Sequence, residues 1–423
     1  MAGTQVPGTP MPTSGVPATS GAPVKSGVPV TSGVSVPSGF PVTDGDAAGP
    51  SPGERAADGT GEGPRARRWC RGTRLLVGAT GVWALLLVLH VLLAGRWWLW
   101  LLVEAVPPLT LVAVPLLLLA VTPLARPVRR WLAPVLVLLL LAGAHLAGFG
   151  AGRTDGTSTG ADGTQVRVFA WSTDYWQMDD DKQDFYAFLR SQDADVYLLQ
   201  EYLYWEGDEP VRIDDTARLH KEFPGYHVSV EGELLTLSRL PVVAEHHRRV
   251  PDTGTAWYRE GSKAQRTDIR VGDRTVSFYN VHMPVPFQVG DNPLSGRFYR
   301  FLQDQYDWRD RELDALRSDL ADNPHPAVLT GDFNSPWTGS LLDPAPGTQV
   351  HSPGSGVLPA RSWPVSDYPL PRLWRLDWLF TTEDLAVPDY RFAGGGDFSD
   401  HAAQEIRLVV PDPTASGHPK ETR

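Results

Sequence analysis

Three long apolar runs constrain what this chain can fold into, because each approaches the ~20 residues needed to cross a bilayer. They span residues 75–94, 99–124 and 131–149. A helix in a soluble protein rarely stays apolar on every face over such a length. The sequence therefore predicts three transmembrane helices within residues 74–150.

Arginine is distributed unevenly around these runs. Five arginines precede the first run, one follows it and three precede the third run: Arg65, Arg67, Arg68, Arg71 and Arg74, then Arg96, then Arg126, Arg129 and Arg130. Basic residues flank membrane helices mainly on the cytoplasmic side. We therefore expect a multi-pass protein of the cell membrane, with a cytoplasmic N-terminus and an extracytoplasmic C-terminal domain.

The second run contains residues that are unusual in a membrane helix. Pro107, Pro108 and Pro115 are expected to kink its helix without breaking it. Glu104 is expected to reach the outer interface, and a functional carboxylate inside the membrane is the alternative.

Residues 1–73 have low complexity, with Ser-Gly pairs recurring every six residues. The pairs begin at Ser14, Ser20, Ser26, Ser32 and Ser38. A β-helix of six-residue repeats is the alternative interpretation, but the recurring prolines would remove hydrogen-bond donors from its ladders. The composition favours a disordered cytoplasmic tail. Residues 151–164 are predicted to be a linker, and residues 412–423 a short tail.

Charge and cysteine content limit the classes of protein that remain. A net charge of −11 argues against a protein that coats nucleic acid with a broad basic surface. A nuclease stays possible, because a small metal site can attract phosphate locally. The single cysteine, Cys70, excludes an internal disulfide, so the fold depends on a full hydrophobic core.

Residues 165–411 are predicted to form one α+β domain. Apolar patterns predict strands at residues 166–171, 196–200, 227–230, 234–238, 267–271, 276–282, 327–330, 378–380 and 405–409. Helical patterns cover residues 182–192 and 297–320. Because strands outnumber helices, we expect a two-sheet α/β sandwich flanked by helices, behind the three membrane helices.

Acidic, amide and imidazole side chains lie at the ends of these strands, where a scaffold can direct them into one cleft. They are Glu201, His282, Asp332 and Asn334 in Gly-Asp-Phe-Asn, Asp377 in Leu-Asp-Trp, and Asp400 and His401 in Ser-Asp-His. Carboxylate ligands suit Mg²⁺ or Mn²⁺. The sequence has no cysteine-rich or His-x-x-x-His spacing for zinc.

The order and spacing of these motifs over residues 166–410 resemble the endonuclease/exonuclease/phosphatase superfamily. This group includes deoxyribonuclease I, abasic-site endonucleases, neutral sphingomyelinases and inositol phosphatases. The resemblance implies a deoxyribonuclease I-like fold and metal-dependent hydrolysis of phosphate esters or pyrophosphates. It also implies that Glu201 is the principal metal ligand, with Asp400 as a second metal-side carboxylate.

The same resemblance implies roles for the other motif residues. Asp332 would orient or deprotonate the attacking water, and Asn334 would hold that water or a phosphate oxygen. Asp377 would orient His401, which would contact the scissile phosphate. His282 would lie near the phosphate and the leaving oxygen.

One motif position departs from the family pattern. Ser172 stands where the family usually has asparagine, and Asp174 falls where some members have a metal-side aspartate. Either Ser172 makes a weaker hydrogen-bonding contribution or Asp174 compensates for it. Arg266 remains open between a phosphate contact and a surface ion pair.

The whole arrangement resembles actinobacterial membrane proteins linked to vancomycin and teicoplanin resistance, which join three spans to this domain. The resemblance implies a lipid-linked phosphate substrate, such as a polyprenyl precursor of the cell wall. A domain tethered to the lipid bilayer also meets lipid phosphates at high effective concentration. The alternatives are an extracellular nuclease acting on DNA or RNA, and a non-catalytic membrane protein that binds a ligand.

Overall fold

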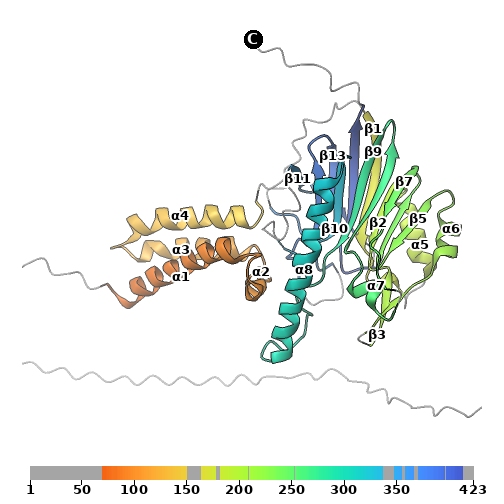
Figure 1. Cartoon of the computed structure of the whole chain (residues 1–423). Coiled ribbons are helices and arrows are strands. Elements are labelled where there is room, and N and C mark those ends of the chain that lie inside the picture. Colours follow the sequence, from red (N-terminus) through yellow and green to blue (C-terminus); the bar gives the residue numbers. More distant parts are fainter. Residues whose placement is uncertain are drawn as a thin grey trace, which may run out of the picture. The chain divides into compact units, whose positions relative to one another are not determined.

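Figure 1 shows the computed structural model, which describes residues 69–149, 163–177, 182–207, 209–251, 253–336, 347–354, 358–365, 370–395 and 397–412. The predicted disordered tail lies outside these residues except for its last few positions. The predicted linker and the C-terminal tail also lie almost wholly outside them.

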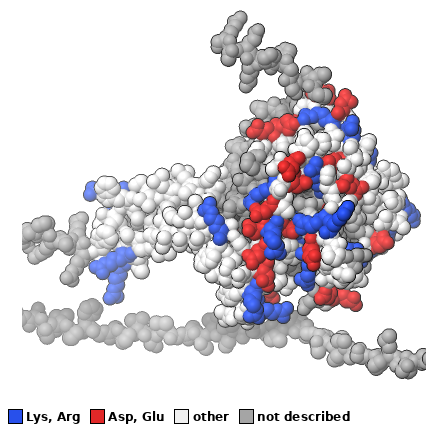
Figure 2. All heavy atoms as spheres, in the orientation of Figure 1, with Lys and Arg blue, Asp and Glu red and all other residues white. Residues whose placement is uncertain are grey.

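Two helices of the apolar region are long and apolar enough to cross a membrane: α1 (Arg71–Leu93) and α4 (Arg129–Leu146). Only 22% and 17% of the residues in their most apolar stretches are buried, unlike those of a core helix in a soluble protein. Leu75 on α1 is 73% exposed and Leu138 on α4 is 66% exposed. The visible surface of this region carries almost no charge except near its two ends (Figure 2).

The second apolar run is not one kinked helix, so that expectation is wrong. It forms η1 (Trp98–Trp100), α2 (Leu101–Glu104), α3 (Thr110–Val121) and η2 (Thr122–Leu124). Proline lacks a backbone N–H and disfavours helix in the residue before it, so consecutive Pro107 and Pro108 break the helix. Pro115 alone is accommodated inside α3.

Glu104 lies at the end of α2, and its side chain turns toward the loop after α1. Its side chain is buried, and its Oε1 accepts a hydrogen bond from the backbone N–H of Gly95 at 3.0 Å. It therefore closes the loop between α1 and α2.

All nine predicted strands are present in the C-terminal domain, within two six-stranded sheets. The first sheet has the order β13 (Ala386–Ala393), β14 (Ala403–Pro411), β1 (Gly163–Ser172), β2 (Val196–Gln200), β6 (Leu234–Ser238) and β5 (His227–Glu231). The second has the order β11 (Thr348–His351), β12 (Asp377–Thr382), β10 (Ala327–Asp332), β9 (Arg274–His282), β8 (Ala264–Val271) and β7 (Val242–His246). A separate hairpin joins β3 (Leu203–Glu206) to β4 (Glu209–Arg212).

Successive side chains of each strand point to opposite faces of its sheet, so each sheet packs against a layer on either side. In β1, Val166 and Val168 pack between the sheets, whereas Phe169 faces the aromatic cluster of α5 (Lys182–Ser191). Tyr279 of β9 packs instead against α8 (Gly296–Asp322). Figure 1 shows α8 on one side of the sheets, with α5 and α6 (Thr216–Glu222) on the other. The predicted two-sheet α/β sandwich is therefore confirmed.

The directions of the strands bring the ends of several strands to one edge of the sandwich. β1 runs parallel to β2, and β9 runs parallel to β10. The register pairs Asp332 with His282 on one side and with Asp377 on the other. The predicted site residues lie at this edge.

Candidate active site

Close contact between β9 and β10 positions the central carboxylate, Asp332. Gly331 precedes it with φ +139°, and a Cβ added there would lie 2.1 Å from the carbonyl oxygen of Val281. Only glycine fits this approach without displacing the backbone. The Gly-Asp motif thus sets a buried Asp332 beside His282.

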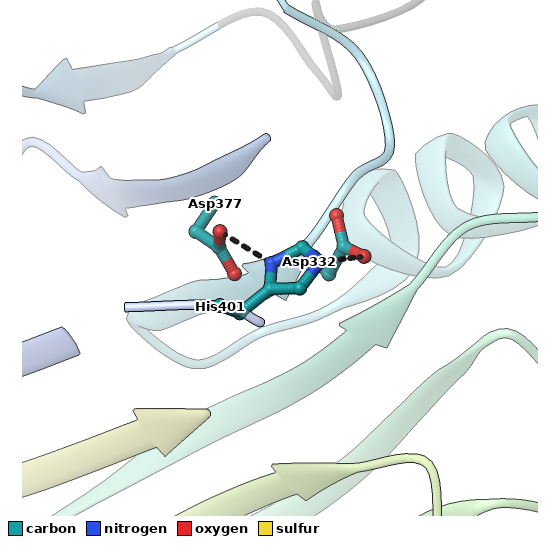
Figure 3. A group of neighbouring side chains, drawn as sticks. All are labelled: Asp332, Asp377 and His401. Atoms are coloured by element: carbon teal, nitrogen blue, oxygen red, sulfur yellow. Dashed lines mark hydrogen bonds and ion pairs between the residues drawn. The ribbon is translucent and has the colours of Figure 1, made fainter. Parts of the chain in front are cut away.

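His401 lies between two carboxylates, as Figure 3 shows. Its Nδ1 is 2.9 Å from Oδ2 of Asp377, and its Nε2 is 3.7 Å from Oδ2 of Asp332. Burial alone would lower the pKa of His401, but Asp377, Asp332 and Asp400 raise it well above its ordinary value. These carboxylates therefore favour the imidazolium form of His401, and the contact with Asp377 fixes the orientation of its ring.

A second imidazole, His282, faces Asp332 from the other side. Its Nε2 lies 3.7 Å from Asp332 Oδ2 and 3.8 Å from Glu201 Oε1. Its Nδ1 lies 3.2 Å from Oε2 of Glu233. Burial would lower the pKa of His282, but Glu233, Glu201 and Asp332 raise it to about 9. Two cationic rings thus flank one carboxylate.

Asn334 is held in a constrained turn directly after Asp332. Its φ is +49°, and its backbone N–H donates to Asp332 Oδ1 at 2.7 Å. Its side-chain Nδ2 donates to the carbonyl oxygen of Met283 at 2.9 Å. Non-glycine residues with positive φ concentrate at functional sites.

Glu201, Asp400 and Asp174 form the acidic side of the site. Burial, together with the charges of Asp400 and Asp174, raises the pKa of Glu201 to about 7, although the imidazoles of His282 and His401 oppose the shift. Glu201 has φ +61° and Asp174 has φ +52°. Trp363 Nε1 donates to Asp400 Oδ2 at 2.6 Å.

These carboxylates fit a divalent cation by their chemistry. Neighbouring, partly buried carboxylates repel one another when ionised, and a bound cation relieves that repulsion. A compact alternative is Asp332, Asp377 and His401, whose potential ligand atoms lie within 4.8 Å of one another. In that group the Asp377–His401 hydrogen bond already uses Nδ1, so we favour the all-oxygen set for Mg²⁺ or Mn²⁺.

Ser172 contributes through its backbone rather than its hydroxyl. Its carbonyl oxygen accepts from Ser399 Oγ at 2.7 Å, and Ser399 Oγ accepts from the N–H of His401 at 3.0 Å. The Ser172 hydroxyl is buried and finds no hydrogen-bond partner within the described part of the chain. Ser172 therefore helps to fix the turn that carries His401.

The structure adds a buried ion pair behind His282 that the sequence did not suggest. Lys263 and Glu233 are both 2% exposed and their side chains form an ion pair. Lys263 Nζ lies 3.6 Å from the ring centre of Tyr258. Burial would raise the pKa of Glu233, but Lys263 and His282 lower it to about 2. Glu233 stays ionised and can hold the ring of His282 in place.

Arg266, for which two roles were open, belongs to an ion-pair network outside the site. Its side chain pairs with Asp268 at 3.0 Å and with Asp319 at 3.4 Å. The other expected residues converge at one edge of the sandwich, and their chemical roles remain predictions.

We expect Glu233→Gln to lower the free energy of unfolding by about 3–5 kcal/mol, because it leaves the Lys263 ammonium buried without a counter-charge. Adding Lys263→Met should recover most of that loss. Glu405→Gln breaks an exposed pair with Arg391 and should cost less than about 1 kcal/mol. Denaturant unfolding of the three variants measures these differences. Equal losses for Glu233→Gln and Glu405→Gln would contradict the buried-pair account.

Residues 160–401 match the model of the endonuclease/exonuclease/phosphatase family. A search of the curated proteins gave no match.

Three solved structures are similar to this chain at low identity. A family member from Bacteroides thetaiotaomicron has 14% identity and a TM-score of 0.42, over 59% of this chain and 100% of its own. Truncated Caenorhabditis elegans TDP2 has 18% identity and a TM-score of 0.41, over 58% and 98%. A mannosyl-6-phosphatase from Bacteroides thetaiotaomicron has 14% identity and a TM-score of 0.41, over 58% and 99%.

Proposed function

The chain belongs to the endonuclease/exonuclease/phosphatase family, and from that premise we propose that it is a membrane-anchored phosphoesterase acting outside the cytoplasm on lipid-linked phosphate esters or pyrophosphates of the cell envelope. One observation carries the chemical part of this proposal. Asp332 lies 3.7 Å from each of two imidazoles, and each imidazole is oriented by a further carboxylate.

Each residue of the site can have a separate role in the reaction. Asp332 orients water and accepts its proton as the water oxygen bonds to phosphorus. His401 and His282, both cationic, stabilise the charge that develops on the phosphate oxygens. His282 donates a proton to the leaving oxygen as its bond to phosphorus breaks. A divalent cation held by Glu201, with Asp400 and Asp174, would polarise the phosphate.

The helical region supports membrane anchoring. The large apolar side chains that cover α1 and α4 would be stabilised by lipid rather than water. We propose three crossings, in which α3 and η2 form a short middle one that local thinning of the bilayer accommodates. With cytoplasmic arginines before the first and third crossings, the domain then lies outside.

The surface charge on the visible face of the hydrolase domain does not favour a nucleic-acid substrate. Figure 2 shows acidic and basic side chains mixed over the visible face of the hydrolase domain. Nonspecific binding to a polyanion depends on clustered basic side chains.

A direct test reconstitutes the full chain in liposomes and supplies polyprenyl pyrophosphate, plasmid DNA or a chromogenic phosphodiester, each with and without Mg²⁺. We expect phosphate release from the lipid with the highest kcat/KM, and loss of that release with EDTA. Preferential cleavage of plasmid would favour the nuclease. Metal binding without turnover of any of the three would favour the non-catalytic ligand-binding protein.

Metal removal should also change how stability depends on pH. The folded-state pKa of Glu201 is raised from 4.5 to about 7, so the metal-free fold loses stability as pH rises through that interval. This one group costs about 3 kcal/mol above pH 7. Since a bound cation removes that cost, Mg²⁺ should raise the melting temperature more at pH 7.5 than at pH 5. Differential scanning calorimetry measures this, and an equal increase at both pH values would contradict it.

A further inference from the structure

The loop of residues 284–295 connects the catalytic edge to the start of α8. It begins directly after Met283, whose N–H donates to the carbonyl oxygen of Asp332 at 2.9 Å. It ends at Ser295, whose Oγ caps α8 by accepting from the N–H of Phe298 at 3.2 Å. The loop is therefore anchored at the active site and at a long helix.

Large apolar side chains on this loop face outward. Val285 is 39% exposed, Val289 is 57% exposed and Leu294 is 91% exposed. Phe287 instead points inward, with its ring centre 6.0 Å from that of Phe298. Full burial of such side chains contributes about 1.5–3 kcal/mol each, so their exposure to water is unfavourable. Several large apolar side chains exposed on one loop are typical of an interaction site.

The adjoining turns of α8 contact the segment that follows the proposed first membrane crossing. The ring centre of Tyr299 lies 6.5 Å from that of Trp98, and Tyr306 Oη donates to the carbonyl oxygen of Gly95 at 3.0 Å. Leu101 is buried in the same cluster as Phe298. Because α1 ends at Leu93, these contacts hold the start of α8, and the loop before it, close to the end of a membrane helix.

Charge beside the loop favours an anionic surface. Arg297 and Arg300 are exposed on the first turns of α8, and Asp291 is the only acidic residue of the loop. Apolar side chains beside arginine are the composition of protein surfaces that bind at the interface of anionic bilayers.

We propose that Val285, Val289 and Leu294 insert into the headgroup region of the outer leaflet, with Arg297 and Arg300 next to lipid phosphates. The loop would then hold the active site at the depth of lipid phosphates rather than letting it move freely on a tether. This inference rests on the proposed membrane anchoring and extends it to a second contact with the bilayer.

The test compares two valines of similar exposure. Val289→Cys lies on the loop, and Val243→Cys lies on β7, where Val243 is 52% exposed. Both are made in the full chain after Cys70→Ser removes the only native cysteine. Each is labelled with a nitrobenzoxadiazole fluorophore and reconstituted in phosphatidylcholine and phosphatidylglycerol vesicles that contain a doxyl-labelled phospholipid.

We expect quenching at position 289 to exceed that at position 243 by roughly threefold or more. Charge reversal by Arg297→Glu with Arg300→Glu should reduce the quenching at position 289. Equal quenching at both positions, in protein that floats with the vesicles, would overturn the proposal. Failure to float would instead overturn the anchoring on which it rests. The readout requires no turnover, so it is independent of the substrate.

Discussion

Glu201→Gln should lower metal-stimulated kcat/KM by about a thousandfold or more while leaving the fold intact. The change removes the anionic charge but hardly alters the volume of the side chain. A metal ion contributes several kcal/mol of transition-state stabilisation, which corresponds to a loss of this size. Calorimetric Mg²⁺ binding and steady-state hydrolysis of a chromogenic phosphodiester measure the two effects together.

Glu206→Gln is the matched control, because Glu206 is an exposed glutamate on the neighbouring strand β3. It should leave both binding and turnover unchanged. If Glu201→Gln behaves like this control, another group holds the essential cation. The remaining candidates would be Asp174 with Asp400, or the compact set of Asp332, Asp377 and His401.

His401→Ala should reduce turnover by about 10²–10³-fold, since it removes a preorganised donor to the phosphate. Asp377→Asn should cause a smaller loss, because the ring remains but its orientation and charge are weakened. If the pair acts as one unit through the 2.9 Å contact, the double variant should be little worse than His401→Ala alone. Steady-state kinetics of the three proteins give the coupling energy.

The alternative outcome for this pair is equally definite. If the two losses add in free energy while circular dichroism shows folded protein, Asp377 does not act through His401. Asp377 is fully buried at the start of β12, so it would then serve only to hold that strand. Asp389→Asn, an exposed change on β13, controls for unspecific effects of losing a carboxylate.

The sandwich was predictable because its strands carry strong local signals. Alternation in β1 and continuous apolar runs in β2 and β10 come from burial on one or both faces. Five strands were missed, because their mostly exposed or half-buried residues leave little periodic pattern: β3, β4, β7, β11 and β13. Edge and hairpin strands are specified by pairing partners that are distant in sequence.

The second apolar run is broken because its prolines are consecutive. One proline in a helix leaves a kink that neighbouring groups can satisfy, as Pro115 does inside α3. Two consecutive prolines remove two successive donors and restrict the residue before them. The sequence Pro107-Pro108 is therefore a local signal for a break in the helix, whereas a single proline is a signal for a kink.

Some residues of the site lie in short sequence motifs, and others depend on partners that are distant in the sequence. Asp332, Asn334 and His401 lie in short motifs that follow strands, so they could be named from the sequence. Glu233 could not, because an acidic residue after Glu231-Gly232 is typical of a solvated turn. It becomes a partner of His282 only when β6 and β8 bring it next to buried Lys263.

In the proposed site, carboxylates hold the cation and both imidazoles are free to act on the phosphate. Pulsed EPR of Mn²⁺ bound to the full protein tests this division, because it detects a nitrogen nucleus coordinated to the metal. We expect no directly coordinated imidazole nitrogen in the native protein, and loss of the bound signal in Glu201→Gln. A coordinated nitrogen signal that survives Glu201→Gln and disappears in His401→Ala would place the metal at Asp332, Asp377 and His401, and would contradict the proposed site.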